Sequence, residues 1–337
     1  MFIQPVDEFY RDLNNNMFIS GFLAAVENTF VLLSVHKIHS LRTTARYFMT
    51  SLAAAELFSG VTGNAFFSLW LILNHLKHGT SDVLWRTETV VWMFTTISVT
   101  YNLVNVAVDR YIAITSPLQY YTRMNSTRCL MLIAFTWILA LICASLVYLV
   151  PEKDLPQIWI AGSVIAVVIP FCIIAFCYFS IYRAAKITFP MRSNITDVQQ
   201  MAENRRQRKT ACTFGIITGL FIVVFTPSFI LNCIQLFNPS LYGEWKKVDL
   251  CGGPRREIWI CIAVVPYFSA LFDPWVYVIR MHDFRVALKE LLQSSSRVLM
   301  QRKLENCCER RNKRENRIKD SRGIDSLANE EIFDTTL

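Results

Sequence analysis

Seven long apolar runs constrain this 337-residue chain more strongly than any other feature of its sequence. A helix needs about 20 apolar residues to cross roughly 30 Å of hydrocarbon, and each run is about that long or longer. The runs are Met17–Val35, Tyr47–Leu73, Thr87–Ile112, Leu130–Val150, Trp159–Tyr182, Thr210–Leu236 and Ile258–Ile279. They are too long and unbroken for the alternating strands of a membrane barrel. Core helices of a soluble protein would need a polar face, which these runs mostly lack. The sequence therefore predicts an all-α membrane protein with seven transmembrane helices.

The composition agrees with lipid as the main solvent of the chain. Hydrophobic residues make up 53% of the sequence and charged residues only 18%, whereas soluble domains have about 45–50% and about 25%. The formal net charge of +8 would suggest nucleic acid as a partner of a soluble protein. Here the basic residues gather in particular segments between the runs, so we expect no nucleic-acid partner.

The positions of the Lys and Arg residues predict which side of the membrane each segment faces. With seven spans the termini lie on opposite sides, and cytoplasmic segments carry an excess of Lys and Arg. If the N-terminus is extracellular, 26 of the 34 basic residues are cytoplasmic. We therefore expect an extracellular N-terminus at residues 1–16, a seven-helix region at residues 17–292 and a cytoplasmic tail at residues 293–337. No cleavable signal peptide is evident, because acidic residues precede the first run.

Several ionisable or strongly polar residues interrupt the apolar runs. They are Glu27, Asn28, Glu56, Asp109, Arg110 and Asp273. Such groups are costly inside a bilayer and usually have a function. They are therefore the first candidates for functional residues.

Nearly every run also contains a short motif. The motifs are Asn28, Leu52-Ala53-Ala54-Ala55-Glu56, Asp109-Arg110-Tyr111 with Pro117-Leu118-Gln119-Tyr120 behind it, Trp137, Pro170 with Tyr178, Phe225-Thr226-Pro227 and Asp273-Pro274-Trp275-Val276-Tyr277. In this order they resemble the motifs of the class A (rhodopsin-like) G-protein-coupled receptors. The resemblance covers Met17 to about Leu292, and adenosine and melanocortin receptors are the most similar members.

The resemblance implies a seven-helix bundle, an amphipathic eighth helix from His282 to about Leu292 and a disordered C-terminal tail. It implies a plasma-membrane receptor that binds an extracellular small molecule or peptide and activates a heterotrimeric G protein. It implies no enzymatic activity, and the chain contains no phosphate-binding glycine loop, no HExxH motif and no serine elbow.

By the same resemblance, Arg110 is held by Asp109 in the resting receptor and is released on activation to bind the G protein. The further residues of this switch are Tyr111, Pro117, Leu118, Tyr178, Pro227, Asp273, Pro274 and Tyr277. The segment before the sixth run, Asn204-Arg205-Arg206-Gln207-Arg208-Lys209, offers no acidic partner to Arg110. We therefore expect elevated basal signalling. An ion pair that only anchors the helix at the headgroups is the alternative.

The resemblance places the ligand pocket near Trp92, Phe225, Asn232 and Tyr267. Trp92 stands where amine receptors have an aspartate, which disfavours a biogenic amine. Asn232 matches the asparagine that adenosine receptors use on the purine ring, but Tyr267 replaces their histidine. A nucleoside ligand is one hypothesis, and Asn232 as a helix-packing residue is the other.

Asn28, Glu56 and Asp273 are expected to meet in the middle of the bundle, where members of the family bind a sodium ion. Two neighbouring carboxylates repel, so either a sodium ion lies between them or one of them is protonated. Both alternatives stay open, and we expect no other metal and no cofactor.

The cysteines suggest one disulfide and one site of lipid attachment. Cys251 and Cys261 flank the third outer loop on the oxidising side of the membrane and are candidates for a disulfide. Pairing of Cys251 with Cys233 is the alternative. Cys307 and Cys308 lie among basic residues of the tail, where they are either palmitoylated or free thiols.

The last residues, Thr335-Thr336-Leu337, fit the ligand of a PDZ domain. Three other classes of membrane protein are alternatives to the receptor. A transporter would show internal repeats, and none is seen. A retinal-binding opsin would need a lysine in the seventh run, which Ile258–Ile279 lacks. A scaffold acting through its tail would keep its activity after Arg110→Ala.

Overall fold

The computed structural model describes most of the predicted spans and only parts of the C-terminal third of the chain. The described residues are 4–36, 43–77, 82–151, 154–191, 212–213, 215–216, 218–220, 222–230, 233–234, 237, 260–262, 264–280 and 284–293. The chain divides into two compact units, Met1–Arg285 and Val286–Leu337. Every regular element within the described ranges is helical, as the sequence predicts.

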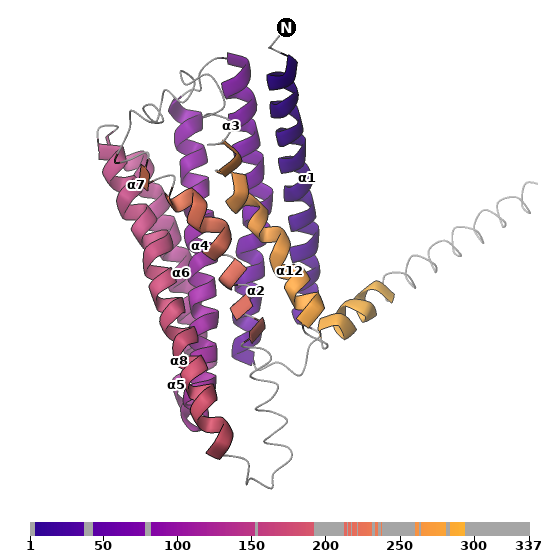
Figure 1. Ribbon diagram of the computed structural model, residues 1–337, viewed down its shortest axis with the longest axis vertical. Helices are drawn as coiled ribbons and strands as arrows, with labels where there is room; N and C mark the ends of the chain where they lie inside the picture. The colour runs from indigo at the N-terminus through magenta and orange to yellow at the C-terminus, as the bar shows by residue number, and fades with distance from the viewer. Residues whose placement is uncertain are drawn as a thin grey trace, which may run out of the picture. The chain divides into compact units, whose positions relative to one another are not determined.

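The helices of the first unit follow the order of the predicted spans (Figure 1). Their bounds are α1 Gln4–Val35, α2 Thr43–Phe58, η1 Ser59–Gly63, α3 Asn64–Lys77, α4 Asp82–Thr115, η2 Pro117–Gln119, α5 Tyr120–Arg123, α6 Ser126–Leu149, α7 Leu155–Ser163, η4 Val164–Val168, α8 Ile169–Met191, η6 Val265–Phe268 and α12 Ser269–Arg280.

Helices of membrane-spanning length account for the first five predicted spans. Within the described residues, five helices are long and apolar enough to cross a membrane, and they lie in the first five predicted spans. Two shorter apolar helices, Thr218–Ile230 and Ile260–Val276, fall in the sixth and seventh spans. The described part of the chain therefore agrees with a seven-helix membrane bundle.

α1 begins at Gln4, well before the predicted start of the first span at Met17. Charged residues lower the mean hydropathy of its first turns, but Tyr10, Leu13 and Met17 are spaced three and four residues apart and share one helix face. Tyr10 and Met17 are buried in a cluster with Trp70, and Leu13 packs against that cluster. Burial of this face extends the helix beyond the apolar run. The extracellular position of residues 1–16 stays a prediction.

Two wide turns interrupt the long helices. η1 joins α2 to α3 and η4 joins α7 to α8, and each is a five-residue π-helix. At η1 the second span closely approaches α1: a Cβ on Gly21 would lie 2.6 Å from the carbonyl oxygen of Gly60 and 2.9 Å from Cβ of Asn64. Nδ2 of Asn64 donates to the Met17 carbonyl at 3.2 Å and to Oγ of Ser20 at 2.9 Å. The wide turn thus lies close to the α1 backbone, and the side chain of Asn64 joins the following helix to α1.

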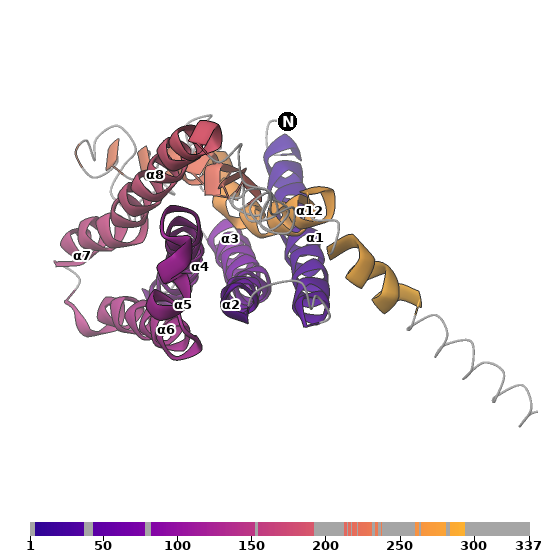
Figure 2. The ribbon, with the colours of Figure 1, turned by 90° about the horizontal axis from the view of Figure 1, so that it is seen from below.

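α4 is the most enclosed of the long helices. Its span is 72% buried, against 28% for the α6 span and 22% for the α8 span. It packs against α2, α6 and α8, and Figure 2 shows it between these helices. Nδ2 of Asn105 in α4 donates to Oγ1 of Thr136 in α6 at 2.9 Å. Because α4 contacts so many neighbours, groups near its two ends can be coupled through one rigid element.

Residues 284–293 are helical, and these bounds agree with the predicted eighth helix from His282 to about Leu292. His282 itself lies outside the described residues. Nη1 of Arg285 donates to the carbonyls of Val278 at 3.0 Å and Ile279 at 2.8 Å, and so satisfies the last turn of α12. The tail from residue 294 onward lies outside the described residues, including Cys307, Cys308 and Thr335-Thr336-Leu337. Their proposed roles stay predictions.

Candidate functional site

A buried ion pair lies near the end of α4. Nε of Arg110 donates to Oδ2 of Asp109 at 2.9 Å, and Nη2 contacts the same oxygen. Asp109 is 1% exposed and Arg110 is 2% exposed. Two charges are buried at high cost unless they are paired. In this conformation the guanidinium of Arg110 is therefore held by the carboxylate of Asp109.

Tyr120, the first residue of α5, adds a third group to the ion pair. Its hydroxyl donates to Oδ1 of Asp109 at 2.6 Å and lies 2.6 Å from Oγ1 of Thr44 in α2. Since the phenolic proton points to Asp109, Thr44 is the donor in the second hydrogen bond. Burial, followed by the charge of Asp109, raises the pKa of Tyr120 to about 12, so the phenol keeps its proton at neutral pH. The carboxylate of Asp109 is thus bonded by groups from α4 and α5, and Tyr120 links it to α2.

Two predicted switch residues connect α8 to its neighbours. The Tyr111 ring of α4 lies 5.9 Å from the Phe176 ring of α8, centroid to centroid. Cε1 of Tyr178 in α8 lies 3.2 Å from the position that a Cβ on Gly215 would take. Gly215 belongs to the sixth span, so both α4 and the sixth span contact α8. The roles of Tyr111 and Tyr178 in coupling stay predictions.

The predicted prolines occupy three different settings. Pro117 begins η2, Pro227 is exposed in the helical stretch 222–230, and Pro274 is buried inside α12. A proline inside a helix removes one backbone hydrogen bond and favours a kink. The side chains of Leu118 and Tyr277 lie outside the described residues.

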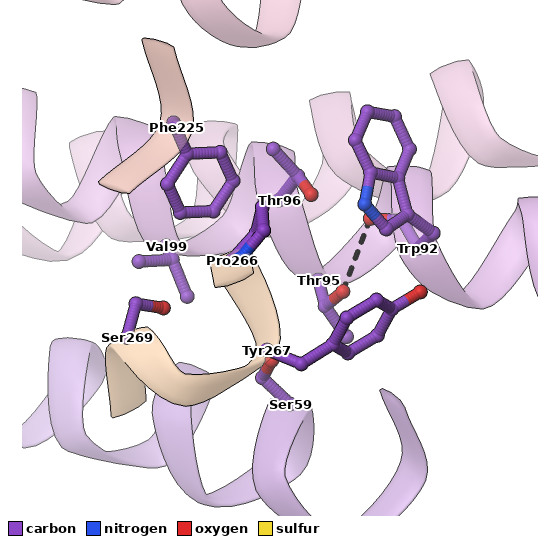
Figure 3. A pocket seen from close by; sticks show the side chains of 9 residues that line it. All are labelled: Ser59, Trp92, Thr95, Thr96, Val99, Phe225, Pro266, Tyr267 and Ser269. Carbon is purple, nitrogen blue, oxygen red and sulfur yellow. Dashed lines mark hydrogen bonds between the residues drawn. The ribbon is translucent and has the colours of Figure 1, made fainter. Parts of the chain in front are cut away.

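A pocket opens between α4, the second span, the sixth span and the seventh span (Figure 3). Its lining residues are Ser59, Trp92, Thr95, Thr96, Val99, Phe225, Pro266, Tyr267 and Ser269. The structure thus brings together three of the predicted pocket residues, Trp92, Phe225 and Tyr267, whereas Asn232 lies outside the described residues. The lining is aromatic and apolar with a few hydroxyl groups, which is the composition typical of sites for small organic molecules.

A carboxylate missing from the predicted site lies next to this pocket. Glu88 precedes Trp92 by four residues in α4, so the two share one helix face. Oε1 of Glu88 accepts a hydrogen bond of 2.7 Å from the hydroxyl of Tyr267. Glu88 is not among the residues that the motifs of the sequence identify. Its place inside the apolar run Thr87–Ile112 is the signal that could have identified it.

Glu56 of α2 and Asp273 of α12 lie close together as a pair of buried carboxyl groups. Their exposures are 3% and 6%, and two carboxyl groups this close are compatible either with a cation between them or with a proton on one of them. Nδ2 of Asn28 donates to the carbonyls of Ala24 at 3.0 Å and Ala270 at 3.1 Å. The predicted cluster is therefore a carboxyl pair, with Asn28 joining α1 to α12 one turn away.

The described residues include no group of three or more His, Cys, Asp or Glu side chains that could hold a metal ion. A sodium ion at Glu56 and Asp273 and a proton on one of the two carboxyl groups are alternatives, and both stay predictions. Cys233 and Cys261 form no disulfide with another described residue, and Cys251 lies outside the described residues. Both proposed pairings of Cys251 stay predictions.

Comparison with known proteins identifies this molecule as a multi-pass membrane receptor. The sequence profile of the 7 transmembrane receptor (rhodopsin family) matches residues 27–277, a range that includes the Arg110–Asp109 pair, the carboxyl pair and the pocket. The chain belongs to this family of receptors.

The similar curated proteins are also receptors. The octopamine receptor beta-1R of Drosophila melanogaster is 26% identical over 324 residues, which cover 82% of this chain and 61% of the relative. The 5-hydroxytryptamine receptor 4 of Rattus norvegicus is 25% identical over 311 residues, covering 80% and 73%. The adenosine receptor A2a of Equus caballus is 23% identical over 304 residues, covering 81% and 70%. These relatives differ in the ligand that their names give, so similarity at this level indicates a receptor without specifying its ligand.

Proposed function

We propose that this receptor converts the binding of an extracellular small molecule into activation of a heterotrimeric G protein. The observation that carries the proposal is the buried Arg110–Asp109 pair, which Tyr120 holds from a separate helix. Trp92 of the pocket precedes Arg110 by 18 residues in the same helix, which corresponds to about 27 Å along its axis. α4 therefore connects a pocket for the ligand to a group for the G protein.

The proposed mechanism is a shift between two populations of the receptor. In the resting population Asp109 holds Arg110, and Tyr120, itself bonded to Thr44, fixes the carboxylate of Asp109 in the position that binds Arg110. A ligand that binds better to the population with the pair open raises the fraction in which Arg110 can contact a partner. The ligand acts only through this difference in affinity.

The orientation of the chain is part of the same proposal. An extracellular N-terminus at residues 1–16 and a cytoplasmic tail at residues 293–337 leave 26 of 34 basic residues on the inner side. With this orientation Arg110 faces the cytoplasm, and the pocket at the other half of α4 is open to extracellular ligands. The eight remaining basic residues belong to the outer segments.

Removal of Arg110 tests the coupling step. We expect wild-type receptor to raise cyclic nucleotide or calcium above mock-transfected cells without ligand, and Arg110→Ala to abolish this signal. Arg123→Ala removes the same charge from an exposed position on α5 and should signal like wild type. Surface expression is measured for all three, so that a folding defect is not read as a coupling defect.

Asp109→Asn supplies a second test. It removes the negative charge that holds Arg110 and should therefore increase the basal signal. If wild type and Asp109→Asn match mock cells in assays for every G-protein class, the proposal is wrong. If Arg110→Ala signals as strongly as wild type, the protein acts by another route, of which a scaffold that uses the tail is the first candidate.

A further inference from the structure

We infer that Glu88 binds a positively charged group of the ligand, such as a protonated amine, next to the pocket of Figure 3. The inference rests on the proposed function, because it assigns the ligand chemistry of the same site. It concerns a residue that no motif in the sequence identifies, and it depends on the charge, partners and surroundings of Glu88.

Glu88 is a carboxylate in a membrane-spanning helix without a basic partner in the described part of the chain. The ion pairs described there join Arg11 to Glu8 and Asp12, and Arg110 to Asp109. Arg86, two residues before Glu88, instead donates to the carbonyls of Val147 and Val150. A carboxylate at this depth is costly unless a cation or hydrogen-bond donors compensate it. A cationic ligand supplies that compensation.

Aromatic residues lie next to the hydrogen-bonded pair of Glu88 and Tyr267. Tyr267 and Trp92 belong to or pack against one apolar cluster that also contains Phe67 and Trp70. The rings of Phe67 and Tyr267 lie 4.7 Å apart, centroid to centroid. Aromatic faces attract ammonium groups, and the attraction increases when water is excluded. A carboxylate beside such rings binds a cation better than it binds a neutral polar group.

Tyr267 orients the carboxylate for this role. Its hydroxyl donates to Oε1 of Glu88 at 2.7 Å, and within the described residues Oε2 has no hydrogen-bond partner. Figure 3 shows the hydroxyl end of Tyr267 directed to the side of the pocket where Trp92 lies, while Phe225 and Val99 lie on the other side. One carboxylate oxygen is thus fixed, and the second remains for the ligand.

The position of Glu88 along α4 restricts where the ligand can carry its charge. Trp92 fills the position at which an aspartate would bind an amine, and Glu88 lies about 6 Å nearer the start of α4 along the helix axis. A ligand that pairs with Glu88 and also contacts Phe225 must carry its cation at one end and an apolar or aromatic body at the other. The tryptophan therefore displaces an amine toward the start of α4 and does not exclude it.

The test measures binding to the full-length receptor in lipid nanodiscs by the shift of its melting temperature. The probes are octopamine, dopamine, 5-hydroxytryptamine and 2-phenylethylamine at millimolar concentration, with 2-phenylethanol as the neutral counterpart of the last. The variants are Glu88→Gln, which keeps an acceptor for Tyr267 but removes the charge, and Tyr267→Phe, which keeps the charge and the ring. Glu27→Gln is the matched control, because Glu27 bonds to Trp275 on the exposed side of α1 and α12.

We expect at least one amine to stabilise wild type and Glu27→Gln equally, and Glu88→Gln to raise the Kd of that amine about ten- to a hundredfold. Tyr267→Phe should raise it about two- to tenfold, because the carboxylate is less well oriented. The response to 2-phenylethanol should be the same in wild type and Glu88→Gln. A purely structural Glu88 would instead weaken both probes together.

The inference is overturned if no amine in the panel stabilises wild type, or if Glu88→Gln binds the amine as tightly as wild type. These outcomes differ from failure of the proposed function. Basal signalling that depends on Arg110 without amine binding removes only the inference about Glu88. Amine binding that depends on Glu88 without any G-protein signal removes the coupling proposal and leaves the binding site.

Discussion

The hydroxyl of Tyr120 lies 2.6 Å from Oδ1 of Asp109, with Thr44 at the same distance on its other side. One phenol therefore connects α2, α4 and α5 at the carboxylate that holds Arg110. Tyr120 is 1% exposed, so water does not replace these bonds in the resting conformation. The stability of the Arg110–Asp109 pair then depends on a residue from the connection between α4 and α6.

Tyr120→Phe should increase basal signalling by about three- to tenfold. Hydrogen bonds to charged groups contribute about 1.5–3 kcal/mol, and part of this is lost in the active population in any case. The measurement is basal cyclic nucleotide or calcium at matched surface expression. Tyr121→Phe is the control, because Tyr121 is adjacent but 73% exposed. An unchanged basal signal in Tyr120→Phe would show that the phenol does not restrain Arg110.

Gly21→Ala should lower the melting temperature of the receptor. The added methyl group would lie 2.6 Å from the Gly60 carbonyl oxygen, and overpacking of this kind costs about 1–3 kcal/mol. Gly219→Ala is the matched control, because its Cβ would meet no atom within 4 Å and alanine favours a helix. Thermal unfolding in nanodiscs compares the two. Equal melting temperatures would mean that α1 and η1 separate at little cost.

We predict that a proton, and not a sodium ion, compensates the buried carboxyl pair of Glu56 and Asp273, so that stability depends little on sodium. If one of the two carboxyl groups is protonated, Asp273→Asn preserves a donor and an acceptor and should unfold near the wild-type temperature. Asp273→Ala leaves Glu56 buried without its partner and should unfold at a lower temperature, by about 1–3 kcal/mol in free energy. The melting temperatures in sodium chloride and choline chloride should agree. Stabilisation of wild type by sodium, lost in Asp273→Asn, would instead establish the cation hypothesis.

Arg86→Met should destabilise the junction of α4 and α6. Nη1 of Arg86 donates to the carbonyls of Val147 at 2.9 Å and Val150 at 3.3 Å, which belong to the last turn of α6 and the residue after it. Unsatisfied carbonyls at a partly buried helix end cost about 1–2 kcal/mol. Arg86→Lys should recover part of the loss, and Arg123→Met on the exposed α5 should unfold like wild type. Identical unfolding of Arg86→Met and Arg123→Met would contradict this assignment.

The spans could be predicted from the sequence because the requirement for apolar length acts on every residue of a membrane helix. Their ends could not be predicted in the same way. α1 extends back to Gln4 because Tyr10 and Leu13 find apolar partners on the second and seventh spans, and no property of residues 4–16 alone reveals those partners. The spacing of Tyr10, Leu13 and Met17 was the available signal.

The sequence motifs identified residues of the site, but they did not predict the long-range contacts that these residues make. Asp109 and Arg110 are neighbours, so their ion pair follows from local chemistry. Thr44 and Tyr120 are 76 residues apart, and only the packing of α2 against the segment after α4 brings their hydroxyls together. Glu88 was not identified from the sequence for another reason. A single carboxylate near the start of an apolar run resembles a loop residue, and only the structure shows its hydrogen bond to Tyr267.

The wide turn at Ser59–Gly63 divides the second span into two halves whose faces are set separately. A π-helical turn holds one residue more than the α-helix allows, and one residue rotates a helix by about 100°. Deleting one residue here would leave Glu56 facing Asp273 while Asn64, Phe67 and Trp70 turned away from α1 and the seventh span. In evolution, a single-codon insertion or deletion at this turn could therefore remodel the half of the helix next to the pocket without altering the half that carries the carboxyl pair.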